Sequence, residues 1–123
     1  MNTTKSDFEN DTKLDSLTYG FIGLGLMGGS LAKAIRNEIF VNPNSEGKLL
    51  ASDCRIQTLE EAKKEGIIDE FFSVEKTKEM LKKCDVVFIC LYPKATKEFI
   101  KNNIEYFKEN AIITDISGVK TEL

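Results

Sequence analysis

The chain has 123 residues, 41% of them hydrophobic, which fits a single globular domain with a normal core. Its 17 basic and 20 acidic residues give a net charge of −3, which argues against nucleic-acid binding because that function needs a basic face. No apolar run is long enough to span a membrane, and no signal peptide is visible, so we expect a cytoplasmic protein. The absence of histidine excludes Ser-His-Asp and Cys-His catalysis and the usual zinc sites, and we predict no metal site.

The predicted elements follow one another in a regular order after a polar N-terminal segment. Residues 1–17 lack a sustained hydrophobic period, so we predict a disordered arm there. Short apolar runs predict strands at 19–24, 48–52, 70–72, 86–91 and 111–116. Helical patterns lie between them at 30–37, around 59–62, at 74–84 and at 97–108. Gly66 is placed to end the second of these helices.

This alternation predicts an α/β fold, a Rossmann-type doubly wound parallel sheet that is truncated after the fifth strand. The dinucleotide-binding domain would be residues 18–123. The last strand, 111–116, is apolar and β-branched and would lie at an open sheet edge. Because such edges pair with other chains, we expect a homo-oligomer.

The three cysteines, Cys54, Cys84 and Cys90, form no C-x-x-C pair and indicate free thiols in a reducing compartment. Cys90 lies within an apolar run, so we predict that it is a core residue.

A glycine-rich motif of the form G-x-G-x-x-G follows the first predicted strand and opens the first helix. It consists of Gly23, Leu24, Gly25, Leu26, Met27 and Gly28. In this context the first glycine permits a tight turn, the second lets the backbone approach a pyrophosphate, and the third allows close helix packing. The alternative, a strand–helix turn without a ligand, explains the motif less completely. The motif therefore predicts a dinucleotide at the helix N-terminus.

Asp53 ends the second predicted strand, close to the spacing expected for an acid that binds the adenosine ribose. A carboxylate there accepts the ribose hydroxyls and repels a 2′-phosphate, which favours NAD over NADP. Arg55 leaves the alternative open, because a nearby arginine can accommodate that phosphate. A second alternative is that Asp53 only caps the following helix.

Asp115, Ser117 and Lys120 lie where the fifth predicted strand ends. Ligands of doubly wound sheets bind at the carboxyl ends of the strands, so these residues could face the nicotinamide half of the dinucleotide. The alternative is a solvated loop in which Asp115 caps the next turn.

Three segments resemble the prephenate dehydrogenase family. Residues 20–32 resemble its opening, Leu91-Tyr92-Pro93 with Thr96 resembles the exit of its fourth strand, and residues 114–120 resemble its T-D-x-x-S-V-K signature. The resemblance implies that the residues in these segments that contact NAD are residues 23–28, Leu91, Tyr92, Pro93, Thr96 and Asp115. It also makes Ser117 and Lys120 candidate catalytic residues. Gly118 stands where the family has its serine, and Ser117 lies one position earlier.

By this resemblance, the intact enzyme oxidises prephenate with NAD and releases carbon dioxide to give 4-hydroxyphenylpyruvate in tyrosine biosynthesis. The family also has a catalytic histidine and a C-terminal substrate and dimerisation domain, and neither is present in this chain. We therefore expect a fragment that binds NAD and is inactive alone. The alternatives are another Rossmann dehydrogenase of the arogenate or 3-hydroxyisobutyrate type, or a non-catalytic nucleotide-binding module. Partners other than prephenate or arogenate, such as nucleic acid or a membrane, are not expected.

Overall fold

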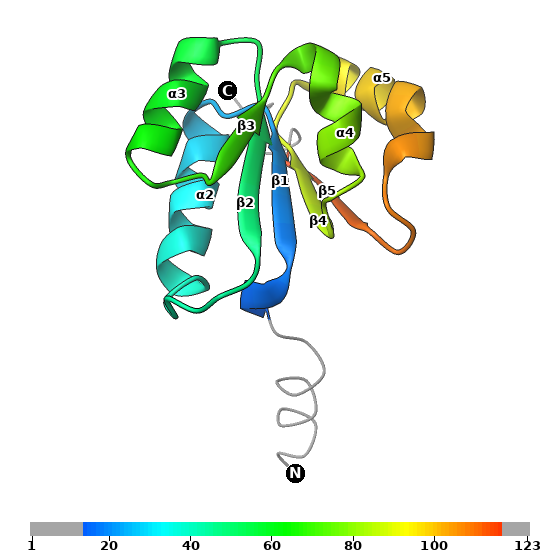
Figure 1. The fold of residues 1–123 in the computed structure, drawn as a ribbon. Coiled ribbons are helices and arrows are strands. Elements are labelled where there is room, and N and C mark those ends of the chain that lie inside the picture. Colours follow the sequence, from blue (N-terminus) through cyan, green and yellow to red (C-terminus); the bar gives the residue numbers. More distant parts are fainter. Residues whose placement is uncertain (1–13, 117–123) are drawn as a thin grey trace.

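The structure, a computed structural model that describes residues 14–116, is built around one parallel sheet (Figure 1). The strands are β1 (Thr18–Ile22), β2 (Lys48–Ser52), β3 (Glu70–Phe72), β4 (Val86–Ile89) and β5 (Ile112–Asp115). Their order is β3-β2-β1-β4-β5, and each pair of neighbours is parallel. This confirms the predicted Rossmann-type fold. The strand order reverses between β1 and β4, which is where such sheets bind ligands.

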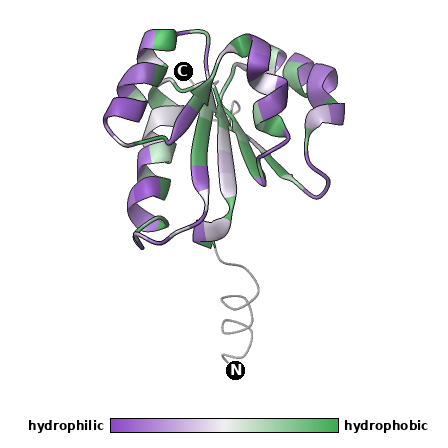
Figure 2. Cartoon of the chain, viewed as in Figure 1, coloured by the Kyte–Doolittle hydropathy of each residue, from purple (hydrophilic) through white to green (hydrophobic). Residues whose placement is uncertain are grey.

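Helices cover both faces of this sheet (Figure 1). α2 (Leu26–Glu38) and α3 (Ile56–Lys64) lie on one face, and α4 (Thr77–Leu81) and α5 (Pro93–Asn103) lie on the other. The described residues also form the short 3₁₀ helices η1 (Leu14–Ser16), η2 (Val74–Lys76) and η3 (Ile104–Tyr106). Figure 2 shows that the strands are mostly hydrophobic, whereas the helices carry hydrophilic stretches. This pattern is typical of a sheet buried between two helical layers.

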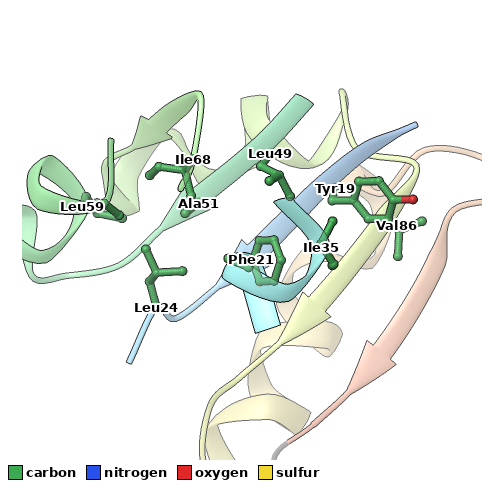
Figure 3. Packing of buried hydrophobic residues seen from close by; sticks show 11 residues of the cluster. Tyr19, Phe21, Leu24, Ile35, Leu49, Ala51, Leu59, Ile68 and Val86 are labelled. Atoms are coloured by element: carbon green, nitrogen blue, oxygen red, sulfur yellow. The ribbon is translucent and has the colours of Figure 1, made fainter. Parts of the chain in front are cut away.

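The sheet separates two clusters of buried side chains, because successive residues of a strand point to opposite faces. On the α2 and α3 side, Phe21 of β1 packs near Leu49, Ala51 and Ile35 (Figure 3). On the α4 and α5 side, the cluster is formed by Ile22, Leu50, Met80, Leu81, Cys84, Val87 and Ile89. Both clusters reach the carboxyl ends of the central strands. The backbone there is therefore held rigidly from two sides.

Two of the cysteines are core residues. Cys90 is buried, as predicted, and so is Cys84. Burial raises the pKa of Cys84 to about 12, so its thiol stays protonated at neutral pH. Cys54 is exposed.

The prediction of a disordered arm over residues 1–17 is wrong for its last part. Residues 14–16 form η1, and the Tyr19 hydroxyl donates a hydrogen bond to the Leu14 carbonyl oxygen at 2.7 Å. The backbone N–H of Gly47 donates to the Asp15 carbonyl oxygen at 2.8 Å, and the Ser45 hydroxyl donates to the Asp15 carboxylate at 2.8 Å. Ser45 and Gly47 are about 30 residues away from Asp15 in the sequence, so a local hydrophobic period does not reveal these contacts. Residues 1–13 lie outside the described residues.

Several predicted boundaries shift where the chain enters or leaves the sheet. β2 and β3 have the predicted bounds, but β1 ends at Ile22 and β4 at Ile89, two residues early. α2 begins at Leu26 rather than at residue 30, so it starts inside the glycine motif. The helix predicted over 74–84 is divided into η2 and α4. β1 and β4 end earlier because the chain leaves the ladder there for the loops that precede α2 and α5.

Candidate functional site

The glycine motif forms the turn between β1 and α2. Gly23 has φ +90°, a conformation that side-chain-bearing residues rarely adopt, and its N–H still donates to the Ser52 carbonyl oxygen at 2.8 Å. At Gly28, a Cβ atom would lie 2.5 Å from the Gly23 carbonyl oxygen. The first and third glycines of the motif are therefore needed for the turn and for close packing of the helix on the strand, as predicted.

The N-terminus of α2 lies at the carboxyl end of β1, directly after the glycine turn. Gly25 is the N-cap residue, so no side chain covers the free N–H groups of the first turn, and that turn carries no acidic residue. Leu26 and Met27, the first two helical residues, are exposed. A 13-residue helix with an uncapped start of this kind offers N–H donors and a positive dipole end to a phosphate group.

Asp53 lies directly after β2 and faces the glycine turn. Its side chain is only 4% exposed. One carboxylate oxygen, Oδ2, accepts the Leu24 backbone N–H at 2.7 Å and Arg55 Nη2 at 2.9 Å. The other, Oδ1, accepts the Arg55 backbone N–H at 2.9 Å and Arg55 Nε at 3.0 Å. The carboxylate thus joins the end of β2 to the glycine turn.

These contacts keep Asp53 ionised. Burial by itself would raise the pKa of the carboxyl, but the hydrogen bonds from Arg55 and Leu24 outweigh burial and lower the pKa to about 2. The negative charge is therefore present at any physiological pH. The possibility that Asp53 only caps α3 is not favoured, because Arg55 is the N-cap residue of that helix and Asp53 also bonds the distant Leu24.

A cavity of about 680 Å³ lies at the carboxyl ends of the central strands, where these features meet. Its lining is mostly apolar, and exposed side chains such as Leu26, Val74 and Tyr92 stand around it. An apolar lining with a few polar groups is typical of a small-molecule site. The volume of about 680 Å³ lies in the range of small-molecule sites.

Most of the predicted site residues line this cavity. The following predicted residues line it: Gly23, Gly25, Leu26, Met27, Asp53, Arg55, Leu91 and Tyr92. Leu24 contributes its N–H to Asp53, and Gly28 is buried behind the turn.

The other predicted residues lie beside the cavity or beyond the described chain. Pro93 is the first residue of α5. Thr96 is buried and its hydroxyl donates to the Leu91 carbonyl oxygen at 3.3 Å, so it supports the loop from behind. Asp115 ends β5, in register with Ile89 of β4. Ser117 and Lys120 lie outside the described residues.

The sequence predictions missed several residues that line the cavity. Ser52, Cys54, Val74, Thr77, Ala95 and Phe99 also line it. Ser52 and Thr77 form a buried pair, with their hydroxyl oxygens 2.9 Å apart, which joins the end of β2 to the start of α4. In the predicted parallel sheet, the carboxyl ends of all strands lie at one edge. The residues that follow those strands could therefore have been expected near the site.

Comparison with known proteins agrees with this geometry. A sequence model for the NAD-binding domain of 6-phosphogluconate dehydrogenase matches residues 18–123. The chain belongs to this family of NAD-binding domains. Its cofactor is therefore NAD, as predicted, and it is a domain of the dehydrogenase type.

The NAD-binding domain also resembles solved dehydrogenases. Prephenate dehydrogenase from Aquifex aeolicus, in complex with hydroxyphenyl propionate and NAD+, is 28% identical with a TM-score of 0.69 over 85% of this chain and 34% of that chain. Arogenate dehydrogenase from Synechocystis is 25% identical with a TM-score of 0.69 over 87% of this chain and 35% of that chain. The predicted resemblance to the NAD-binding domain of prephenate dehydrogenases is thereby confirmed. The chain spans about a third of the length of these enzymes.

More distant matches share the fold alone. 3-Hydroxyisobutyrate dehydrogenase from Mycobacterium tuberculosis is 15% identical, with a TM-score of 0.61 over 80% of this chain and 31% of that chain. No helix among residues 14–116 is both long and apolar enough to cross a membrane.

The residues of the NAD-binding domain fit the chemistry of NAD. The N-terminus of α2 suits the pyrophosphate, because it presents backbone N–H groups where glycines allow a close approach. The buried, ionised Asp53 suits a ribose diol. The apolar walls beside Val74 and Tyr92 suit the flat rings.

Proposed function

We propose that this chain is the NAD-binding domain of a dehydrogenase that acts on prephenate or on its amino analogue, arogenate. The observation that supports this proposal is the likeness to two solved enzymes with these activities, each over at least 85% of the chain. In the prephenate case the reaction is an oxidation with loss of carbon dioxide, and NAD accepts the hydride. The chain would bind and orient the cofactor for that step.

Individual roles follow from the position of each residue. The N–H groups at the start of α2 would bind the pyrophosphate, and Asp53 would accept hydrogen bonds from the adenosine ribose. Leu91 and Tyr92 line the cavity beyond the end of β4, next to β1, and would contact the nicotinamide half. Asp115, at the end of β5 beside β4, would lie on that same side of the site. By the family resemblance, Ser117 and Lys120 are proposed as catalytic residues.

We further propose that the 123-residue chain does not oxidise prephenate by itself. It contains no histidine to act as a general base, a contribution that is typically about 10²–10⁴-fold. A mixture of the chain, NAD and prephenate should therefore give no absorbance increase at 340 nm. Sustained NADH formation by a preparation free of other enzymes would contradict this part of the proposal.

The cofactor part is tested by fluorescence titration of the chain with NADH and, separately, with NADPH. We expect saturable binding of both, with NADH the tighter ligand because Asp53 would repel a 2′-phosphate. Tighter binding of NADPH would mean that Arg55 outweighs Asp53. If neither dinucleotide binds, the assignment of the cavity to a dinucleotide is wrong.

A further inference from the structure

The carboxylate of Asp53 already has four donors. A carboxylate has about four lone-pair positions, and in the structure these are used by two backbone N–H groups and by two nitrogens of the Arg55 guanidinium. Any hydroxyl group that approaches Asp53 has to take the place of one of these donors.

The four donors differ in how easily they can be replaced. The N–H groups of Leu24 and Arg55 belong to the backbone at the glycine turn and at the start of α3, and they are fixed by the fold. The Arg55 guanidinium is carried on a long side chain that is 56% exposed, whereas the Asp53 side chain is 4% exposed. The side chain of Arg55 is therefore the one donor that can leave without disturbing the sheet.

We propose that Arg55 is an internal competitor of the cofactor ribose for Asp53, and that it thereby limits how tightly the domain binds NAD. This inference rests on the proposed role of Asp53. A ribose diol carries two hydroxyl donors, the same number that the guanidinium places on the two oxygens. Cofactor binding would exchange one pair of donors for the other, and the guanidinium would move toward solvent.

This competition has a consequence whose sign is unusual. A positive charge beside an anionic dinucleotide ordinarily strengthens binding, so removing it should weaken the complex. If Arg55 competes for Asp53, removing its side chain should strengthen NAD binding instead. The Arg55 side chain is more than half exposed, so solvent screens its pair with Asp53, and such a pair contributes about 0.2–1 kcal/mol, which corresponds to a gain of up to about fivefold.

The same movement affects the choice between NAD and NADP. The displaced guanidinium stays two residues from Asp53 along the chain and would therefore remain near the ribose that Asp53 binds. There it can pair with a 2′-phosphate, which offsets the repulsion from Asp53. Arg55→Ala should therefore tighten NADH binding and weaken NADPH binding.

The experiment is a fluorescence titration of wild type, Arg55→Ala and a matched control with NADH and NADPH. The control is Lys48→Ala, which removes the same charge from an exposed ion pair with Glu70 at the amino end of β2, away from the cavity. We expect about two- to fivefold tighter NADH binding for Arg55→Ala and no change for Lys48→Ala.

A double-mutant cycle with Asp53→Asn tests the route of the effect, with circular dichroism as the check that each variant is folded. In the Asp53→Asn background, Arg55→Ala should no longer strengthen NADH binding, because the contested charge is gone. An equal gain in both backgrounds would overturn the proposal. Unchanged or weaker NADH binding by Arg55→Ala alone would also overturn it, while leaving the cofactor site intact. If no variant binds NADH, it is the proposed function that fails.

Discussion

Two adjacent glycines in the first turns of α2 should respond in opposite ways to alanine. At Gly28 the added Cβ would lie 2.5 Å from the Gly23 carbonyl oxygen and 3.4 Å from the Cys90 sulfur, so backbone must move. At Gly29 the same atom would have no neighbour within 4 Å outside its own helix. The pair therefore separates the effect of close packing from that of helix propensity.

The magnitudes follow from these contacts. Overpacking costs about 1–3 kcal/mol, and a Cβ atom 2.5 Å from a backbone oxygen places Gly28→Ala in the upper part of that range. The clash therefore outweighs the roughly 1 kcal/mol that alanine gains over glycine inside a helix and leaves a net loss of about 1–2 kcal/mol. Gly28→Ala should lower the free energy of unfolding and reduce the melting temperature by about 5–10 °C. Gly29→Ala should raise the free energy of unfolding by about 0.5–1 kcal/mol.

Thermal and urea unfolding followed by circular dichroism measure both changes. NADH titration adds a second readout, because a shifted Gly23 turn would also misplace the pyrophosphate site. Equal stabilisation by the two substitutions would refute the reasoning, since it would mean that α2 does not pack as closely on β1 as the structure shows.

Three further predictions concern charge, the buried hydroxyls and the sheet edge. The pKa of Asp53 is lowered to about 2, so its contribution to stability is complete above about pH 4 and is lost as the pH falls toward 2. Asp53→Asn should remove this component from acid unfolding curves, and identical curves would contradict it. Thr77→Val leaves the Ser52 hydroxyl without its partner and should lower the free energy of unfolding, measured with urea, by about 1–3 kcal/mol. In a Ser52→Ala background this cost should disappear, because no hydroxyl is then left unpaired. Self-association through β5, measured by sedimentation over a concentration series, should weaken in Ile112→Lys, because Ile112 is exposed whereas Ile113 packs against the core. A chain that stays monomeric at high concentration would contradict the expected homo-oligomer.

The sequence predicted those parts of the site that depend on local constraints. The glycine spacing predicted the turn because residues with side chains rarely adopt the φ of +90° at Gly23 and do not fit the close approach at Gly28. Asp53 was found by its position at the end of an apolar run. Val74, Thr77 and Phe99 were missed as lining residues because they approach the cavity only through the packing of η2, α4 and α5.

The role of Arg55 also depends on tertiary geometry that the sequence does not show. Its presence near Asp53 was evident from the sequence and left the choice between NAD and NADP open. The sequence does not show that its guanidinium bonds both carboxylate oxygens, because that geometry depends on side-chain orientation.

The attachment of η1 has a practical consequence for handling the domain. Tyr19 and Gly47 hold Leu14 and Asp15 at the amino ends of β1 and β2, while the cavity lies at the carboxyl ends of the strands. The two ends of the sheet are opposite each other in Figure 1. The domain can therefore be immobilised on a sensor surface through its N-terminal side with the cavity facing the solution. Cofactor binding measured in this way should match that in free solution.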